Sequence, residues 1–206
     1  MIKVKEKKER ALGERLQLKG ERCNSPKCAA VRKPYRPGIH GPKKRLKTVS
    51  EFGRQLAEKQ KFKITYRLKE KNLRRLFGEA DKKAGSTADK LLELMERRLD
   101  NVVYHLGLAG SSRGLARQLI LHGHFLVNQK RVRSPGFQVK TNDLIAFREE
   151  SKKLKNLSDL RNNLKKYEPP SWLFLDKEKL EGRVLSLPEN QSSPFEINLL
   201  VESFSK

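Results

Sequence analysis

The chain has 206 residues, a net charge of +23 and a pI of about 10.2, with 36% hydrophobic and 7% aromatic residues. It contains no run of about 18 apolar residues and no apolar core of a secretory signal, and two cysteines exclude a disulfide-rich secreted scaffold. We therefore expect a soluble, cytosolic protein with packed cores that binds a polyanion, and this charge excess favours nucleic acid over a small ligand or a membrane.

The positive charge is concentrated in the N-terminal part of the chain. Residues 1–90 hold 28 basic and 10 acidic residues, whereas residues 91–206 hold 19 basic and 14 acidic residues. A single run such as Lys43, Lys44 and Arg45 can be a solvated arm, but a region with a net charge of +18 repels itself and favours an anionic partner. The proline- and glycine-rich residues 33–42 predict an extended basic loop that becomes ordered against that partner.

Helical patterns follow this loop. Thr48 and Glu51 resemble a capping box that starts a helix reaching about residue 61, with Phe52, Leu56 and Phe62 as its apolar anchors. Apolar residues at three- and four-residue spacing predict further helices over about 69–83, 87–106 and 112–122. Because Arg113 and Arg117 lie one turn apart on the last of these, they form a basic face.

The apolar period then changes towards two, which is typical of strands. Residues 125–127 and 131–133 predict a hairpin around the turn Asn128, Gln129 and Lys130, and residues 137–139 and 144–147 predict two more short strands. A helix over about 152–166 is followed by strand-like runs at 172–175, 183–187 and 197–204. Since a helix and a hairpin that are both basic follow one another, we expect a concave positive surface, with plain surface solubility as the alternative.

Residues with metal or catalytic chemistry are few. The sequence contains no glycine-rich phosphate loop, HExxH motif or nucleophile elbow. His122 and His124 flank Gly123, and they could bind a metal, stabilise the helix–strand junction or contact RNA. Cys23 and Cys28 are either two free thiols or half of a zinc knuckle, because a structural zinc needs four ligands.

Two runs in the middle of the chain resemble the S-four RNA-binding module. They are RRLDNVVYHLG at residues 97–107 and GLARQLILHGH at residues 114–124. The flanking segments LKGERC (18–23), PYRPG (34–38), EKQK (58–61) and VESFS (201–205) are similar to the bacterial small-subunit ribosomal S-four family. The resemblance covers nearly the whole chain.

The resemblance implies an α+β fold in two domains. The first domain, residues 1–90, is mostly helical and is completed by about residues 180–206. The second domain, residues 91–170, is the S-four RNA-binding module, with two helices packed on a small antiparallel sheet. Because Asn128 and Gln129 stand where the family often has Asn-Gly, and a positive φ is unfavourable at Gln129, we expect a looser hairpin turn than type I′.

The resemblance also implies a non-enzymatic structural constituent of the small ribosomal subunit in the cytoplasm. Such a protein binds 16S rRNA directly, nucleates assembly of the subunit body, contributes to translational accuracy and contacts neighbouring small-subunit ribosomal proteins. It needs no membrane and no small-molecule substrate. The zinc-bearing members have an additional cysteine pair, for which this chain has Glu6 and Glu9, so we expect no cofactor and a knuckle held by rRNA.

Basic residues of both domains are the predicted rRNA contacts. In the first domain they are Lys43, Lys44, Arg45, Arg54, Lys59, Lys61, Tyr66, Arg74 and Arg75. In the second domain they are Arg97, Arg113, Arg117, His122, His124, Lys130, Arg131 and Arg133. No residue is expected to be catalytic. The alternatives are an RNA-modifying enzyme that carries the module as an appended domain, and a free RNA chaperone.

Overall fold

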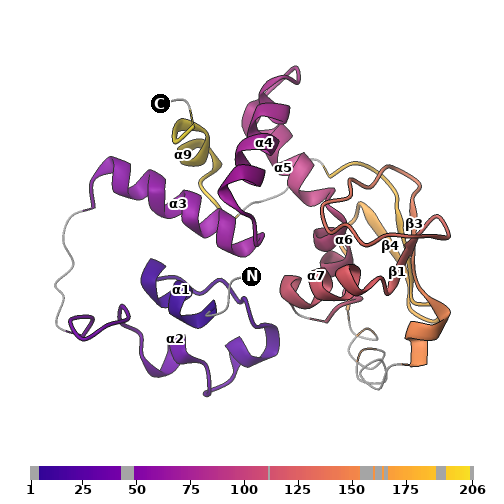
Figure 1. The fold of residues 1–206 in the computed structure, drawn as a ribbon, viewed down its shortest axis with the longest axis horizontal. Helices are drawn as coiled ribbons and strands as arrows, with labels where there is room; N and C mark the ends of the chain where they lie inside the picture. Colours follow the sequence, from indigo (N-terminus) through magenta and orange to yellow (C-terminus); the bar gives the residue numbers. More distant parts are fainter. Residues whose placement is uncertain are drawn as a thin grey trace. The chain divides into compact units, whose positions relative to one another are not determined.

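The computed structural model describes residues 5–42, 49–110, 112–153, 160, 164, 167–188 and 194–204 (Figure 1). The chain divides into two compact units, Met1–Leu91 with Ser192–Lys206 and Leu92–Gln191. The helix α5 (Thr87–Glu96) crosses the division. Within the described ranges, no helix has the length and apolarity needed to cross a membrane.

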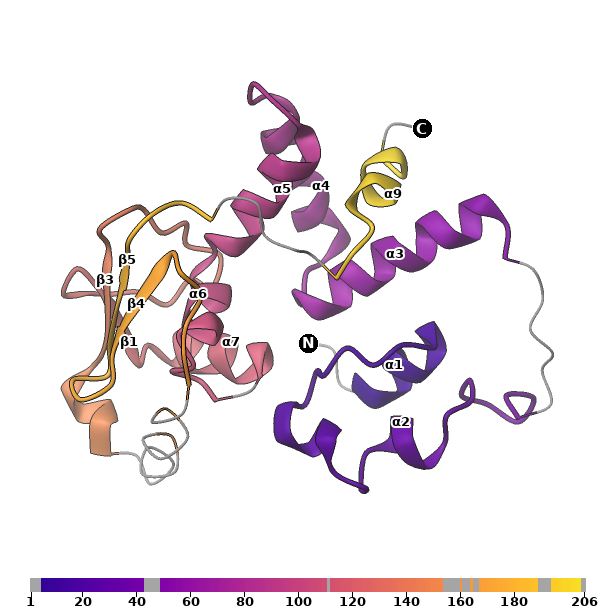
Figure 2. The same ribbon diagram turned by 180° about the vertical axis from the view of Figure 1, so that it is seen from behind.

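The described part of the first unit is helical. Its elements, with the first half of α5, are α1 (Lys5–Leu12), the 3-10 helix η1 (Gly20–Asn24), α2 (Ala29–Arg32), α3 (Glu51–Thr65), α4 (Glu70–Asp81) and α9 (Ile197–Glu202). In Figure 2, which shows the fold from behind, the C-terminal end of α3 leads into α4. The predicted helix over 69–83 is confirmed by α4, whose buried residues Leu73, Leu76 and Ala80 lie on one face.

The helix α3 differs from its prediction in its cap and in its anchors. Ser50 is the N-cap, and its Oγ accepts a hydrogen bond of 3.2 Å from the N–H of Gly53; the expected cap Thr48 lies outside the described residues. Phe62 is fully buried, but Phe52 and Leu56 are 69% and 44% exposed, so two of the three predicted anchors are wrong. The helices α1 and α9 contact α3, and the buried residues of α3 are Gln55, Phe62, Ile64 and Thr65.

The C-terminal segment is helical where we predicted a strand at 197–204. Ile197 and Leu200 are buried one turn apart on α9, which packs along α3 (Figure 1). Just before α9, the ring of Phe195 lies 5.3 Å from that of Phe62 and 5.8 Å from that of Tyr66. Because the C-terminal segment packs against a helix and not against a sheet, its buried apolar residues have helical spacing.

The second unit contains the sheet and the helices that cover it. The described elements, besides the second half of α5, are α6 (Leu99–His105), α7 (Arg113–His122), β1 (Phe125–Val127), β2 (Lys130–Arg131), β3 (Leu144–Phe147), the 3-10 helix η2 (Glu149–Lys153), β4 (Leu173–Asp176) and β5 (Glu181–Val184). The five strands are antiparallel, in the order β2-β1-β3-β5-β4. The predicted hairpin and the strand at 144–147 are confirmed, but the second strand of the hairpin, β2, begins at Lys130, which we predicted in the turn, and ends at Arg131.

The predicted helix over 87–106 is two helices. It breaks at Arg98, whose backbone is extended (φ −68°, ψ 136°) and forms an isolated bridge with Gln138. The predicted strand at 137–139 consists only of that bridge. In the break, the N–H groups of Leu99 and Asp100 donate to the carbonyls of Phe137 and Pro135 at 2.9 and 3.1 Å, so a tertiary contact replaces the intrahelical bonds.

The two strand-like runs near residues 172 and 183 lie in the sheet of the second unit. Leu144 pairs with Arg183, and Leu173 pairs with Val184. We expected residues from about 180 onwards to complete the first domain, whereas those up to Gln191 belong to the second unit and only the segment from Ser192 returns. Most of the predicted helix over 152–166 lies outside the described residues.

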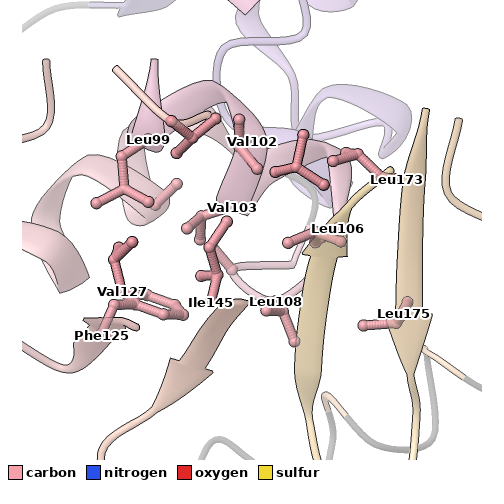
Figure 3. Packing of buried hydrophobic residues seen from close by; sticks show 14 of the residues in the cluster. Leu99, Val102, Val103, Leu106, Leu108, Phe125, Val127, Ile145, Leu173 and Leu175 are labelled. Atoms are coloured by element: carbon pink, nitrogen blue, oxygen red, sulfur yellow. The ribbon is translucent and has the colours of Figure 1, made fainter. Parts of the chain in front are cut away.

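The core of the second unit lies between α6 and α7 and one face of the sheet (Figure 3). Leu99, Val102, Val103 and Leu106 project from α6 onto side chains that share this face; these are Phe125, Val127, Ile145, Leu173 and Leu175. Each such burial contributes about 1.5–3 kcal/mol. A Cβ added at Gly182 of β5 would lie 2.7 Å from Leu106 Cδ2, so the absence of a side chain there lets α6 approach the sheet.

The turn between β1 and β2 is tighter than expected. Asn128 and Gln129 both have positive φ, 48° and 64°, and Val127 pairs with Lys130 across them. The side chain of Asn128 donates to Asp143 Oδ1 at 2.8 Å and accepts from the N–H of Leu144 at 2.9 Å. These bonds fix the turn from β3, so the expectation of a looser turn was wrong.

Candidate nucleic-acid interface

Exposed cations of the first unit lie on α3 and α4. Arg74 and Arg75 are exposed on the face of α4 opposite Leu73 and Leu76. Arg75 lies 3.5 Å from Glu79, an exposed pair of the kind that contributes little to stability, so its charge remains accessible. Arg54 is exposed on α3. These arginines have the exposure that a phosphate contact requires.

Lys59 and Lys61 are engaged within the protein. Lys59 Nζ lies 3.2 Å from Glu70 and 3.7 Å from the centre of the Phe204 ring. Lys61 Nζ lies 2.7 Å from Glu14 and 3.1 Å from Glu58. Burial lowers the pKa of Lys61, but the hydrogen bonds to Glu14 and Glu58 outweigh it and raise this pKa above 10.5.

The remaining predicted residues of this unit divide between buried and undescribed positions. Tyr66 is 6% exposed, and its ring lies 4.7 Å from that of Phe62. Lys43, Lys44 and Arg45 lie outside the described residues. In the loop before them, the guanidinium of Arg10 lies 5.1 Å from the Tyr35 ring centre and donates to the carbonyls of Lys33 and Tyr35 at 2.8 and 3.1 Å.

Two carboxylates of α1 bind the segment around the two cysteines. Glu6 lies 3.1 Å from both Lys19 and Arg22, and buried Glu9 accepts the N–H of Leu18 at 3.0 Å. Cys23 and Cys28 are buried free thiols. Burial, followed by the nearby Glu9 charge, raises the Cys23 pKa despite a hydrogen bond from Lys19 N–H. Among the described residues, no three His, Cys, Asp or Glu side chains gather to hold a metal.

In the second unit, Asp100 holds two arginines. It accepts two hydrogen bonds from Arg98, of 3.1 and 2.8 Å, and one from Arg117 Nη1 at 3.3 Å. Arg98 and Asp100 are buried, whereas Arg117 is partly exposed. The predicted contact Arg117 therefore has an internal partner and an accessible portion.

Arg113 and Arg97 are similarly tied to the protein. Arg113 Nε donates to Asn101 at 2.7 Å, and its guanidinium lies 4.2 Å from the Tyr104 ring centre. Arg97 donates to the carbonyl of Val139 at 3.1 Å and to Glu93 at 3.0 Å. These bonds orient both side chains and occupy part of their donor capacity.

Asn101 links Arg113 to a buried polar cluster. Its Nδ2 donates to Glu96, and Glu96 Oε2 lies 2.9 Å from His105 Nε2. Glu96 and Asn101 are 5% and 1% exposed. Because buried polar groups stabilise a fold only when they are paired, this cluster fixes the α5–α6 junction beneath the arginines.

The clearest cluster of predicted contacts is at the C-terminal end of α7. Gly123 has φ 75° and ends the helix, which leaves His122 and His124 on either side with ring centres 6.1 Å apart. Arg131 of β2 reaches back to donate to the carbonyls of Gly123 and His122 at 3.2 and 3.1 Å. The structure thus brings together three of the predicted residues.

Two further cations lie in the same hairpin, and one lies beyond it. Lys130 and Arg133 are exposed. Arg148, which we did not predict, follows β3 and donates its N–H to the carbonyl of His124 at 2.9 Å. The signal for Arg148 in the sequence was its position directly after the strand predicted at 144–147. Planar guanidinium groups and imidazoles with exposed edges suit phosphate oxygens better than they suit an uncharged ligand.

This arrangement defines an RNA-binding class of protein, in which two helices on an antiparallel sheet present a cationic helix–hairpin edge. The family model described as "S4 domain" matches residues 97–145, and the one described as "Ribosomal protein S4/S9 N-terminal domain" matches residues 2–96. The chain belongs to the family of small ribosomal subunit proteins uS4, as its resemblance implied.

Curated relatives match almost the whole chain. "Small ribosomal subunit protein uS4" of Pelotomaculum thermopropionicum is 45% identical, and that of Acetivibrio thermocellus is 47% identical. "Small ribosomal subunit protein uS4A" of Alkaliphilus oremlandii is 48% identical. Each match covers 94% of this chain and 93% of the relative.

Proposed function

We propose that this chain is a structural constituent of the small ribosomal subunit in the cytoplasm. It binds 16S rRNA directly, nucleates assembly of the subunit body and contributes to translational accuracy. Its partners are that rRNA and neighbouring small-subunit proteins. The observation that carries the proposal is the sequence identity of 45–48% to curated small-subunit proteins over 94% of the chain, because this match extends through both units.

The charge distribution supports a binding mechanism in which both units contact the RNA backbone. Arg54, Arg74 and Arg75 offer exposed charge in the first unit, and the edge formed by α7 and the hairpin offers it in the second. Each phosphate that these side chains neutralise releases counterions, so affinity falls with salt. Specificity comes from RNA shape, since side chains cannot read a deep and narrow A-form groove.

We further propose that the protein performs no chemical reaction. An RNA-modifying enzyme would need a catalytic domain beside the S-four module, but the residues that could supply it match a ribosomal N-terminal domain. The best-defined side chains of the module, such as Asp100 and Asn101, hold arginines in place. Their role in the proposal is to position the contacts.

Zinc is not part of the proposed function. The ion pairs of Glu6 with Lys19 and Arg22, and the hydrogen bond of Glu9 with Leu18, tie together the segment that contains Cys23 and Cys28. In this proposal these carboxylates and rRNA together stabilise the knuckle. Metal analysis of the purified protein tests this point, and stoichiometric zinc would contradict it.

Footprinting of purified 16S rRNA with and without the protein tests the main proposal. The expected result is a defined protected region and a log–log salt slope of roughly −0.7 to −0.9 for each phosphate contact. Co-sedimentation with small subunits at high salt distinguishes a subunit constituent from a free RNA chaperone. Absence of protection at moderate salt would overturn the proposal.

A further inference from the structure

We propose that His122, His124 and Arg131 form a phosphate-binding cradle that takes up a proton on His124 when RNA binds. Binding at this edge is then coupled to pH, with tighter binding as the pH falls. The inference rests on the proposed rRNA-binding function and adds a regulatory property to it. It comes from the way these three residues are arranged around Gly123.

The first step concerns the helix terminus. The C-terminal end of an α-helix carries partial negative charge, which repels a phosphate. Here the guanidinium of Arg131 covers the carbonyls of His122 and Gly123. A Cβ at residue 123 would lie 2.7 Å from Arg131 Nη2, so this cover depends on glycine. The end of α7 is thereby converted into a cationic surface.

The second step concerns the hydrogen bonding of His124. Its Nδ1 lies 2.9 Å from Ser151 Oγ, and no partner for its Nε2 occurs among the described residues. A hydroxyl group can donate to a neutral imidazole or accept from a protonated one. Protonation of His124 therefore keeps the bond to Ser151 and leaves Nε2–H as a donor to a phosphate oxygen.

The third step concerns the charges that face His124. They are His122 from α7, Arg131 from β2 and Arg148 from the segment after β3, and all of them disfavour a further positive charge. Glu149 and Glu150 are the acids of that last segment, and Glu150 lies 2.6 Å from Arg148. Burial, followed by the electrostatic effects of His122, Arg131 and Arg148, lowers the pKa of His124 below 6.5 in the free protein.

A bound phosphate reverses this balance. An adjacent anion favours the charged imidazole, so the pKa of His124 is higher in the complex than in the free protein. Affinity is then constant above the pKa of the complex, rises as the pH falls between the two pKa values, and becomes constant again below that of the free protein. A difference of about one pKa unit gives about a tenfold gain in affinity.

The experiment measures the affinity of the full-length protein for transcribed 16S rRNA from about pH 8 to about pH 5.5, on both sides of the ordinary histidine pKa of about 6.5. His124→Gln, which retains a hydrogen-bonding side chain, is compared with wild type and with Glu178→Gln, a change on an exposed turn. Calorimetry near pH 6.5 in buffers of different ionisation enthalpy counts the protons taken up. Comparison of variants on one RNA cancels any titration of the RNA itself.

The expected result is a gain of about tenfold for wild type and Glu178→Gln as the pH falls, and a gain at least threefold smaller for His124→Gln. Proton uptake should decrease in the same variant. If His124→Gln keeps the full pH dependence, the coupling is refuted while the binding function stands. If no protein binds the RNA at any pH, the proposed function itself fails. Circular dichroism at each pH confirms that the compared proteins are folded.

Discussion

Asp100 joins Arg98 and Arg117 through a single buried carboxylate, although only Arg117 reaches the surface. Arg98 occupies the break between α5 and α6, so the carboxylate couples the geometry of that break to the basic face of α7. One side chain thereby serves both the fold of the second unit and the orientation of a predicted RNA contact.

We therefore expect Asp100→Asn to destabilise the second unit by about 3 kcal/mol, because it leaves a buried guanidinium without its counter-charge. Trp172 is the only tryptophan and lies in this core, so its fluorescence during urea unfolding reports on this unit. Glu178→Gln, on an exposed turn, is the control and should change stability by less than about 0.5 kcal/mol. Equal midpoints for the two variants would contradict this role for Asp100.

The glycine at the end of α7 gives a second prediction. Gly123→Ala places a Cβ against Arg131 at a residue with φ +75°, and the left-handed conformation alone costs about 1–2 kcal/mol. We expect lower stability and weaker RNA binding from this variant.

Gly78→Ala is the matched control for Gly123→Ala, because nothing lies within 4 Å of an added Cβ in the middle of α4. It should raise stability by about 0.5–1 kcal/mol. Filter binding and thermal unfolding of both proteins measure the two effects. Equal affinities of the two variants for 16S rRNA would separate Arg131 from binding.

Substitution of Lys61 in the first unit should affect stability, whereas substitution of Lys130 or Arg133 in the hairpin should affect RNA binding. Lys130→Ala and Arg133→Ala, at exposed positions, are each expected to reduce the salt slope of rRNA binding by about 0.7–0.9 with little effect on stability. Lys61→Ala removes the partner of Glu14 and Glu58 and is expected mainly to lower the unfolding temperature.

Measuring the salt slope of rRNA binding and the unfolding temperature of each variant shows whether the residue contacts RNA or stabilises the fold. A salt slope reduced by Lys61→Ala in a fully folded protein would place that side chain on the RNA. A lower unfolding temperature for Lys130→Ala would instead give the hairpin lysine a structural role.

Acid should weaken the first unit through Glu6 and Glu70. Burial raises the pKa of each carboxyl, but hydrogen bonds from Lys19 and Arg22 to Glu6, and from Lys63 and Lys59 to Glu70, outweigh it and hold both pKa values below 4.5. A carboxylate with a lowered pKa in the folded state stabilises fully above its unfolded pKa. This stabilisation is lost as the pH falls through the folded value.

Glu70→Gln should therefore reduce the loss of stability on acidification below pH 4.5, whereas the exposed Glu79→Gln should retain it. Urea unfolding followed by NMR signals of α4 at several pH values measures the difference. An identical pH dependence for wild type and Glu70→Gln would refute this linkage.

The sequence predicted the described helices α3, α4 and α7 and the β1–β2 hairpin, because their periodicity and turn residues act locally. It did not predict the break at Arg98, which is created by contacts with residues 135–138. It also placed Phe52 and Leu56 in a core, because periodicity does not show which stripe of a helix finds a partner. The prediction of a strand at 197–204 was wrong because packing on α3, which lies far away in the sequence, determines that this segment is helical.

The sequence predicted which basic residues lie close together, but not the contacts that hold them. The spacing of Arg113, Arg117, His122 and His124 located the basic edge, but the bonds from Asn101 and Asp100 to the two arginines depend on tertiary packing. Lys59 and Lys61 showed only their charge in the sequence. Their carboxylate partners come from α4, from α3 itself and from the segment after α1, which charge counting does not reveal.

The docking of Phe195, Ile197 and Leu200 on α3 has a consequence for the order of folding during synthesis. The second unit is continuous from Leu92 to Gln191, so the described strands of its sheet have been translated before α9. The first unit begins before the second unit in the chain, yet it acquires α9 only after the second unit has been translated. Because domains fold as units during synthesis, the RNA-binding module is complete before the domain that precedes it in the chain.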